Sequence, residues 1–147
     1  MSKSTAFVDN YLPALLGQAW YLLSNEFRPV VEGHGLSVLE WRVLSALASS
    51  RVMTVSQLAE MTVSKQPTVT RLLHRLEAQG HVVRSSSLDD RRCTLVKVTP
   101  SGRRVVTGLI KLAEDHQKEI LNTLSPEKVE VLMNSLKDLV RLHRTAE

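Results

Sequence analysis

The chain has 147 residues, 43% of them hydrophobic, which is enough for one domain with a buried core and too short for two of ordinary size. Its 19 Lys and Arg outnumber its 15 Asp and Glu, giving a net charge of +4 that favours a polyanionic partner, and charges interrupt every apolar run, which argues against membrane function. The single cysteine, Cys93, excludes an intramolecular disulfide, and the N-terminal sequence lacks the apolar run of a signal peptide, so we expect a cytoplasmic protein.

Apolar residues at steps of three and four predict a first amphipathic helix over residues 11–31. Asp9 or Asn10 is the expected cap, and Gly33 and Gly35 are expected to end the helix. Two capping boxes then predict helices over residues 37–49 and 55–61, because a Ser or Thr followed three residues later by Glu or Gln satisfies two free amides. These boxes are Ser37 with Glu40 and Thr54 with Gln57.

The next helix is predicted over residues 64–79, with Ser64 as its cap, Pro67 in its first turn and Gly80 as its left-handed end. An apolar stripe predicts which face packs in the core. This stripe is Val69, Leu72, Leu73 and Leu76. The opposite face is small, polar or basic throughout and consists of Ser64, Pro67, Thr68, Thr70, Arg71, His74 and Arg75. Nothing on that face requires burial.

Two short strands, residues 81–84 and 93–98, are predicted on either side of a charged hairpin tip over residues 85–92. Two long helices follow, one starting with Thr99 and Pro100 and the other with Ser125 and Pro126. The expected fold is therefore mainly α with a small β-hairpin wing. We expect one domain over residues 1–147, with a winged helix-turn-helix region at 36–99 and dimerisation helices at 10–31 and 100–144. The apolar stripes of these terminal helices are too long for the central region to bury, which predicts a homodimer.

Basic residues are concentrated in residues 62–104, which hold nine Lys or Arg and three Asp or Glu. This segment includes the predicted polar helix and the hairpin, the elements that would contact duplex DNA. One helix fits the major groove while flanking elements contact phosphate. The predicted DNA-binding residues are Ser64, Lys65, Gln66, Thr68, Thr70, Arg71 and Arg75 of the helix, and Asp90, Arg91 and Arg92 of the hairpin tip. The alternative is a solvated face on which Arg75 pairs with nearby acids.

These segments resemble the MarR family of bacterial regulators from Leu12 to about Arg141. The resemblance rests on Leu36-Ser37, Glu40-Trp41, Leu44, Gln57-Leu58-Ala59, SKQPTVTRLLHRLEAQG, DDRRCTLVKVT and Ser101-Gly102. It implies an obligate homodimer whose terminal helices interlock, whose two wings straddle a palindromic operator, and which releases DNA on binding a small aromatic anion, as many relatives do. It also implies that Arg92 reaches the minor groove and that Asp90 orients it. His81 and Pro67 depart from the usual family pattern.

Aromatic residues are only 4% of the chain, yet both tryptophans and both tyrosines lie within its first 41 residues. In one interpretation Trp41 anchors the core and Trp20 packs in the dimer seam. In the other, Tyr11, Trp20 and Trp41 line a cleft for a small aromatic acid effector, with His34 or Arg42 near its mouth.

Other chemistry finds little support. The five histidines include no pair three or four apart, so a metal sensor would need scattered ligands. We expect no cofactor and no enzymatic activity, because no nucleophile lies beside a base and no glycine-rich phosphate loop is present. The sequence predicts a DNA-binding repressor. The alternative is a winged-helix module that binds protein, although such a module more typically exposes an apolar or acidic recognition face.

Overall fold

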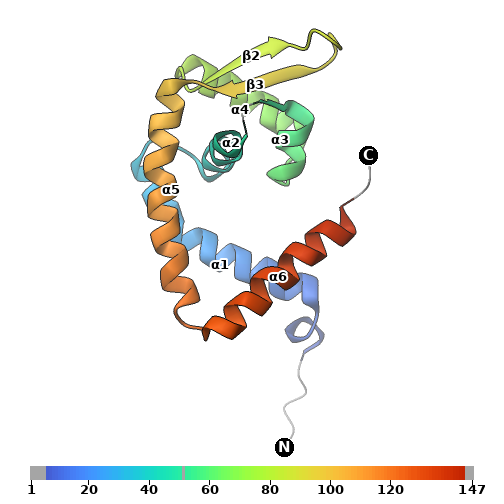
Figure 1. The fold of residues 1–147 in the computed structure, drawn as a ribbon, viewed down its shortest axis with the longest axis vertical. Coiled ribbons are helices and arrows are strands. Elements are labelled where there is room, and N and C mark those ends of the chain that lie inside the picture. Colours follow the sequence, from blue (N-terminus) through green and yellow to red (C-terminus); the bar gives the residue numbers. More distant parts are fainter. Residues whose placement is uncertain (1–5, 51, 145–147) are drawn as a thin grey trace, which may run out of the picture. The chain divides into compact units, whose positions relative to one another are not determined.

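The computed structural model describes residues 6–50 and 52–144 and is mainly helical, with one small antiparallel sheet (Figure 1). The elements in chain order are η1 (Phe7–Asp9), α1 (Leu12–Gly33), α2 (Val38–Ser49), β1 (Met53–Thr54), α3 (Val55–Met61), α4 (Gln66–Ala78), β2 (Val82–Ser86), β3 (Thr94–Val98), α5 (Pro100–Leu121) and α6 (Pro126–His143). The predicted fold class is confirmed. The chain divides into two compact units, Met1–Ile110 and Lys111–Glu147, with the boundary inside α5.

Both predicted capping boxes are present. The Ser37 hydroxyl accepts from the Glu40 amide at 3.1 Å, and Thr54 and Gln57 bond reciprocally at the start of α3. The predicted cap of α1 is wrong, because Asp9 belongs to η1, where its carboxylate accepts from the amide of Ala6 at 3.1 Å. The cap position of α1 is instead taken by Tyr11, which makes no side-chain bond there. The helix also runs to Gly33 rather than ending at residue 31.

The prediction that Ser64 caps α4 is wrong, as the turn between α3 and α4 shows. The amide of Ser64 donates to the carbonyl of Ala59 at 2.9 Å, and the amide of Val63 donates to Glu60 at 3.1 Å. This pair of bonds is the Schellman ending of a helix, with Val63 at φ 53° in the left-handed position that glycine usually takes. Because Ser64 belongs to this helix ending, α4 begins at Gln66, two residues after the start of the predicted range. Lys65 occupies its cap position without a side-chain bond.

The sheet has the order β1-β3-β2, with Met53 opposite Val96 and Arg84 also opposite Val96 on the other side. β2 and β3 form a hairpin as predicted, and its tip extends beyond the helices of the first unit (Figure 1). The predicted tip over residues 85–92 was too long, because Ser85 and Ser86 belong to β2 and pair with Leu95 and Thr94. β1 was not predicted, because a two-residue strand is too short to show an alternating pattern.

The core of the first unit lies between α2, α3, α4 and the sheet. Its fully buried side chains include Val43, Leu44, Leu47, Leu58, Val69, Leu73, Leu76, Val82, Val96 and Leu109. The predicted stripe of α4 is confirmed except at Leu72, which is only half-buried. At the start of α5, a Cβ on Gly102 would clash with the carbonyl oxygen of His81, so glycine allows α5 to approach the start of the hairpin.

The terminal helices are much less buried. Of the 22 residues of α1 only Phe27 and Val31 are buried, and no residue of α6 is. Exposed apolar residues of α1 are Leu12, Leu15, Leu16, Trp20, Tyr21 and Leu22, and those of α6 are Val131, Leu132, Val140 and Leu142. None of the helices within residues 6–50 and 52–144 combines the length and the apolar character needed to cross a membrane.

Candidate nucleic-acid interface

The outer face of α4 presents most of the predicted DNA-binding residues to solvent. Lys65, Gln66, Thr68, Thr70, Arg71 and Arg75 are exposed, whereas Ser64 is half-buried and donates its hydroxyl to the carbonyl of Thr62 at 3.2 Å. At the first residue of α4, Gln66 Nε2 donates to Ser56 Oγ of α3 at 2.6 Å. Hydroxyl, amide and guanidinium groups that hydrogen-bond base edges therefore lie together on one helix face.

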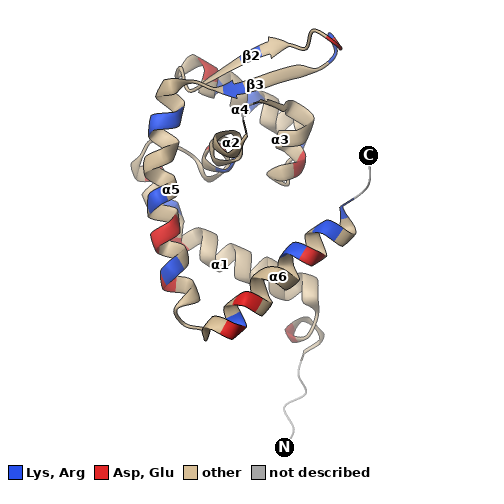
Figure 2. Ribbon diagram, in the orientation of Figure 1, with Lys and Arg blue, Asp and Glu red and all other residues tan. Residues whose placement is uncertain are grey.

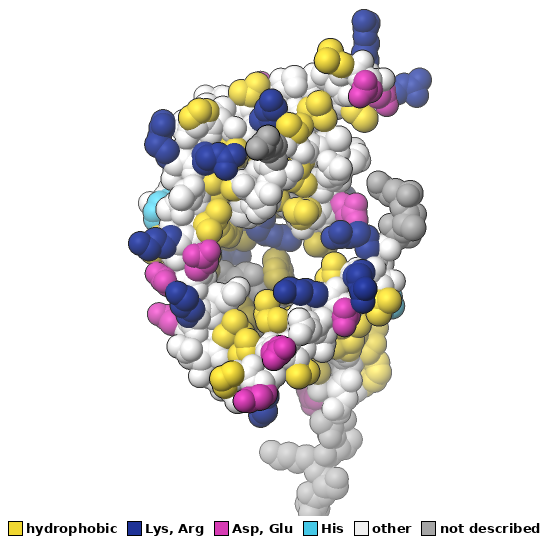
Figure 3. Space-filling model, viewed as in Figure 1, with side chains coloured by type: hydrophobic (Ala, Val, Ile, Leu, Met, Phe, Trp, Pro, Cys, Tyr) yellow, Lys and Arg dark blue, Asp and Glu magenta, His cyan; other side chains and the backbone are white. Residues whose placement is uncertain are grey.

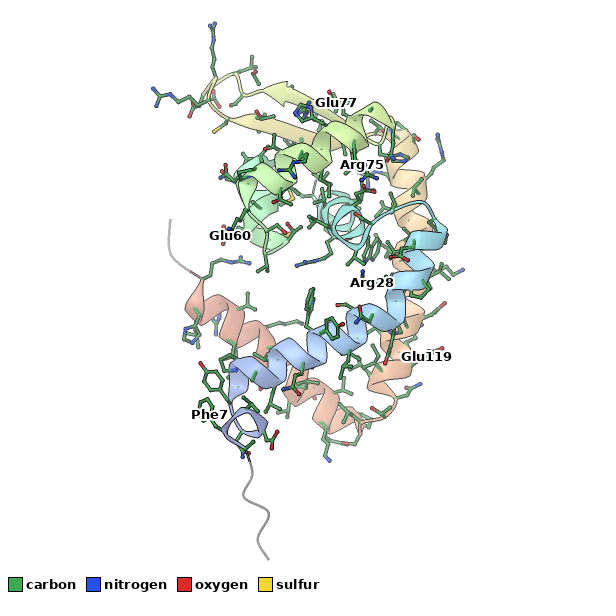
Figure 4. All side chains as sticks on the ribbon, turned by 180° about the vertical axis from the view of Figure 1, so that it is seen from behind. Phe7, Arg28, Glu60, Arg75, Glu77 and Glu119 are labelled. Carbon is green, nitrogen blue, oxygen red and sulfur yellow. The ribbon has the colours of Figure 1, made fainter. Side chains whose placement is uncertain are left out.

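Arg75 is tied to α2 by an ion pair. Its Nη2 lies 3.0 Å from Glu40 Oε1, and the Glu40 side chain is 1% exposed while that of Arg75 is 67% exposed. The other oxygen of Glu40 accepts from the amide of Ser37 at 3.3 Å, so one carboxylate serves both the capping box and α4. This pairing is the one that the solvated-face interpretation anticipated for Arg75. Figure 4 labels Arg75 on α4.

Arg71 lies beside this pair and forms no ion pair with any residue that the structure describes. A cavity of about 190 Å³ between the start of α2 and α4 is lined by Ser37, Leu39, Glu40, Thr68, Arg71, Leu72 and Arg75. The two arginines thus share one edge of a shallow depression. Of these two arginines, Arg71 is the one whose donors are available to an external acceptor.

A third contact joins α4 to the hairpin. Arg84 of β2 pairs with Glu77 of α4, its Nε lying 3.0 Å from Oε2, and its backbone amide donates to the same oxygen at 3.1 Å. Arg84 Nη2 also donates to His74 Nδ1 at 2.8 Å. The hydrogen bond from Arg84, helped by its charge, holds the pKa of Glu77 below the usual glutamate value. The sequence did not indicate this contact, which joins residues seven and ten apart.

The hairpin tip carries Arg91 and Arg92 together with Asp89 and Asp90 (Figure 2). Asp90 Oδ1 accepts from the backbone amide of Arg92 at 2.9 Å, so this contact holds the main chain of Arg92 and not its guanidinium. Basic side chains project outward from this tip (Figure 3). The tip therefore offers exposed cations whose main chain is held by a hydrogen bond, an arrangement suited to phosphate or a narrow minor groove.

The predicted effector residues are only partly brought together. The Arg42 guanidinium lies 5.5 Å from the centre of the Trp20 ring, and burial lowers its pKa. Trp41 packs instead against Phe27, with ring centroids 5.7 Å apart. Tyr11 stacks on Phe7 at 4.8 Å, and His34 Nδ1 donates to the carbonyl of Val30 at 2.8 Å. Trp20 and Arg42 are thus the pair that the fold assembles.

Within the described part of the chain, no three His, Cys, Asp or Glu side chains are grouped so that they could hold a metal ion. Cys93 is half-buried, and its thiol lies 3.7 Å from Asp90 Oδ2 at the base of the tip.

A helix pair with an exposed polar second helix, followed by a basic hairpin, defines a protein of the winged helix-turn-helix class. The sequence profile of the MarR family matches residues 34–92. The chain is 32% identical to the HTH-type transcriptional regulator YfiV of Bacillus subtilis strain 168 over 158 aligned positions, covering 100% of this chain and 96% of that one. The chain belongs to the MarR family.

Two further relatives illustrate the range of the family. The homoprotocatechuate degradative operon repressor of Escherichia coli is 29% identical over 134 residues, covering 91% of this chain and 90% of the relative. The crystal structure of NadR in complex with 4-hydroxyphenylacetate superposes with a TM-score of 0.82 at 25% identity, covering 97% of this chain and 99% of NadR. The predicted family membership is thus confirmed.

Proposed function

We propose that this protein is a repressor that binds a pseudo-palindromic operator in duplex DNA as a homodimer. The supporting observation is the exposed polar face of α4, which is attached to α3, α2 and β2 through Gln66, Arg75 and Glu77. A helix held at three points by its neighbours presents its side chains in a fixed geometry, as base reading in the major groove requires. Residues 36–99 form the DNA-binding region in this proposal, within a single domain over residues 1–147.

In this proposal α4 and the hairpin tip have different roles. Thr68, Thr70 and Arg71 are proposed to contact base edges, whereas Arg91 and Arg92 contact phosphate or the minor groove. Ser64, Lys65 and Gln66 lie where α4 would enter the groove. Asp90 supports the tip through the main chain of Arg92.

A homodimer is supported by the exposed apolar residues of α1 and α6. Leu15 is 44% exposed and Leu132 is 40% exposed, and such residues on successive turns are a costly surface for a monomer. We propose that residues 10–31 and 100–144 are dimerisation helices. Two-fold symmetry would then place half-sites about 10 bp apart.

We propose that a small aromatic carboxylate releases this dimer from DNA. NadR has been crystallised with 4-hydroxyphenylacetate, and in this chain Trp20 beside Arg42 supplies an aromatic face and a cation. The aromatic ring of the ligand would stack on Trp20 and its carboxylate would bind the Arg42 guanidinium. Tyr11, Trp41 and His34 make other contacts in the structure and are not part of this proposed site. Release requires that the ligand binds more tightly to a dimer whose recognition helices are wrongly spaced.

The test of DNA binding is selection of bound sequences from random duplex DNA by the purified protein, followed by affinity measurements on the selected site. We expect a palindromic motif that Arg71→Ala reads less strictly at one base position, with a loss of affinity of about 1–3 kcal/mol. Lys111→Ala, an exposed basic residue of α5 remote in sequence from the site, is the matched control and should bind normally. Selection of no motif would reject the proposal.

The effector is tested separately, by titrating salicylate and 4-hydroxyphenylacetate while tryptophan fluorescence and DNA affinity are followed. We expect quenching and DNA release over the same concentration range, and loss of both in Trp20→Leu. Quenching without any change in DNA affinity would show a pocket that does not regulate.

A further inference from the structure

The contact between Ser56 and Gln66 links the start of α3 to the start of α4. Ser56 is the second residue of α3 and Gln66 the first of α4, and the 2.6 Å bond between their side chains lies at the surface. An exposed glutamine ordinarily samples many rotamers, so ordering it at the surface costs conformational entropy. Here the hydroxyl of Ser56 and the adjoining Pro67, which restricts the backbone of the first turn, fix where the amide lies.

The bond leaves a particular set of donors and acceptors available. Gln66 Nε2 has two N–H groups, and one of them donates to Ser56 Oγ. When Nε2 donates its hydrogen trans to Oε1, the remaining N–H lies beside Oε1, and both can face one base edge. This pair matches adenine in the major groove, where N7 accepts and the N6 amino group donates. Guanine presents two acceptors at the same edge, N7 and O6, so Oε1 would have no donor to meet.

We propose that Gln66 reads an adenine of the operator and that Ser56 is the positioning residue that holds its amide in the reading orientation. This inference rests on the proposed DNA binding and assigns one base to it. Ser56 does not touch the base. It acts by lowering the entropy that Gln66 loses on binding and by fixing which amide edge faces the groove.

The experiment compares the base preferences of wild type, Ser56→Ala, Ser56→Thr and Gln66→Ala by selection from random DNA. Wild type is expected to prefer adenine about tenfold at one position of each half-site. Gln66→Ala should lose that preference, Ser56→Ala should reduce it about threefold, and Ser56→Thr, which keeps the hydroxyl, should retain it. The control is Ser49→Ala, because Ser49 is an exposed helical serine whose hydroxyl bonds only to its own helix, at Ser45.

A chemical substitution in the DNA gives a second readout that protein stability does not affect. Replacing the adenine by 7-deazaadenine removes the N7 acceptor, so wild type should lose affinity while Gln66→Ala should not. The double variant Ser56→Ala with Gln66→Ala should show the same affinity loss as Gln66→Ala alone, because Ser56 acts only through Gln66.

The outcomes separate the two claims. A wild type that selects no motif refutes DNA reading itself. The positioning role is overturned if wild type selects a motif and Ser56→Ala leaves its adenine preference unchanged. It is also overturned if Ser56→Ala causes a further loss when it is added to Gln66→Ala. A motif without any adenine that responds to Gln66→Ala overturns the assignment of the base.

Discussion

Replacing Arg75 by alanine should lower the stability of the protein, whereas the same change at Arg71, one turn earlier on α4, should not. Arg75→Ala removes the guanidinium that lies 3.0 Å from the carboxylate of Glu40. In the wild type that carboxylate is 1% exposed, and its other oxygen accepts from the amide of Ser37. An uncompensated buried charge is the physical origin of the loss.

The magnitude follows from the unequal burial of the pair. Removing one partner of a fully buried pair costs about 3–5 kcal/mol, and an exposed pair contributes about 0.2–1 kcal/mol. Glu40 is buried but Arg75 is 67% exposed, so water reaches one side of the contact. We expect Arg75→Ala to cost about 2 kcal/mol, which corresponds to a fall in Tm of about 6 °C in a chain of this size. Arg71→Ala should stay within about 0.5 kcal/mol.

Urea unfolding of both variants at one protein concentration provides the measurement, and Glu40→Gln provides the control. Glutamine keeps an acceptor for the capping box but carries no charge, so the double variant Glu40→Gln with Arg75→Ala should be more stable than Arg75→Ala alone. Equal stability of the Arg71 and Arg75 variants would refute the reasoning. A double variant less stable to urea than Arg75→Ala would show that the Glu40 carboxylate stabilises α2 without Arg75.

Arg92→Ala should weaken binding to all DNA sequences similarly, and it should lower the slope of log K against log salt concentration by about two, because the homodimer loses one arginine in each protomer; affinity measurements at several salt concentrations would reveal this change. The ion pair of Glu77, whose pKa is depressed, stabilises the fold above the usual glutamate pKa and is lost as the pH falls through the lower folded value, so the stability gap between wild type and Glu77→Gln should shrink below about pH 4. A gap that widens in acid would contradict this sign. Leu15→Asp and Leu136→Asp should each shift sedimentation toward the monomer, because each places a charge on an apolar face. Val63→Gly should raise stability by about 0.5–1 kcal/mol in thermal unfolding, since glycine adopts φ 53° without strain.

Most of the fold could be predicted from local sequence patterns. The capping boxes at Ser37 and Thr54 were readable because each places both partners within one turn, and Gly80 was readable because its left-handed conformation recurs at helix ends. The predicted cap at Ser64 failed for a related reason. A serine before a helix has the same local signature whether it caps that helix or completes the ending of the previous one, and Val63 gave no glycine signal to distinguish the two.

The candidate site was predicted as a set of residues but not as a set of contacts. Charge and helical spacing identified Arg71 and Arg75 as neighbours on α4, yet only the tertiary structure separates an available arginine from one paired with Glu40. The bond from Gln66 to Ser56 spans ten residues and two helices, a separation at which no periodic pattern relates side chains. Pairings of this kind depend on how helices cross, which single-sequence periodicity does not encode.

The attachments of α4 restrict how a ligand would control DNA binding. Ser56 of α3 holds the start of α4, whereas Glu40 of α2 and Arg84 of β2 both hold its last turn, through Arg75 and Glu77. Bending α4 alone would break three polar contacts, one of which involves a buried carboxylate. Moving α2, α3, α4 and the hairpin together breaks none of them. We therefore expect an effector to change the spacing between two intact recognition units of a dimer. In a variant that lacks the contact between Glu40 and Arg75, DNA affinity should already be reduced before ligand is added. The release of DNA from that variant should then depend less cooperatively on ligand concentration.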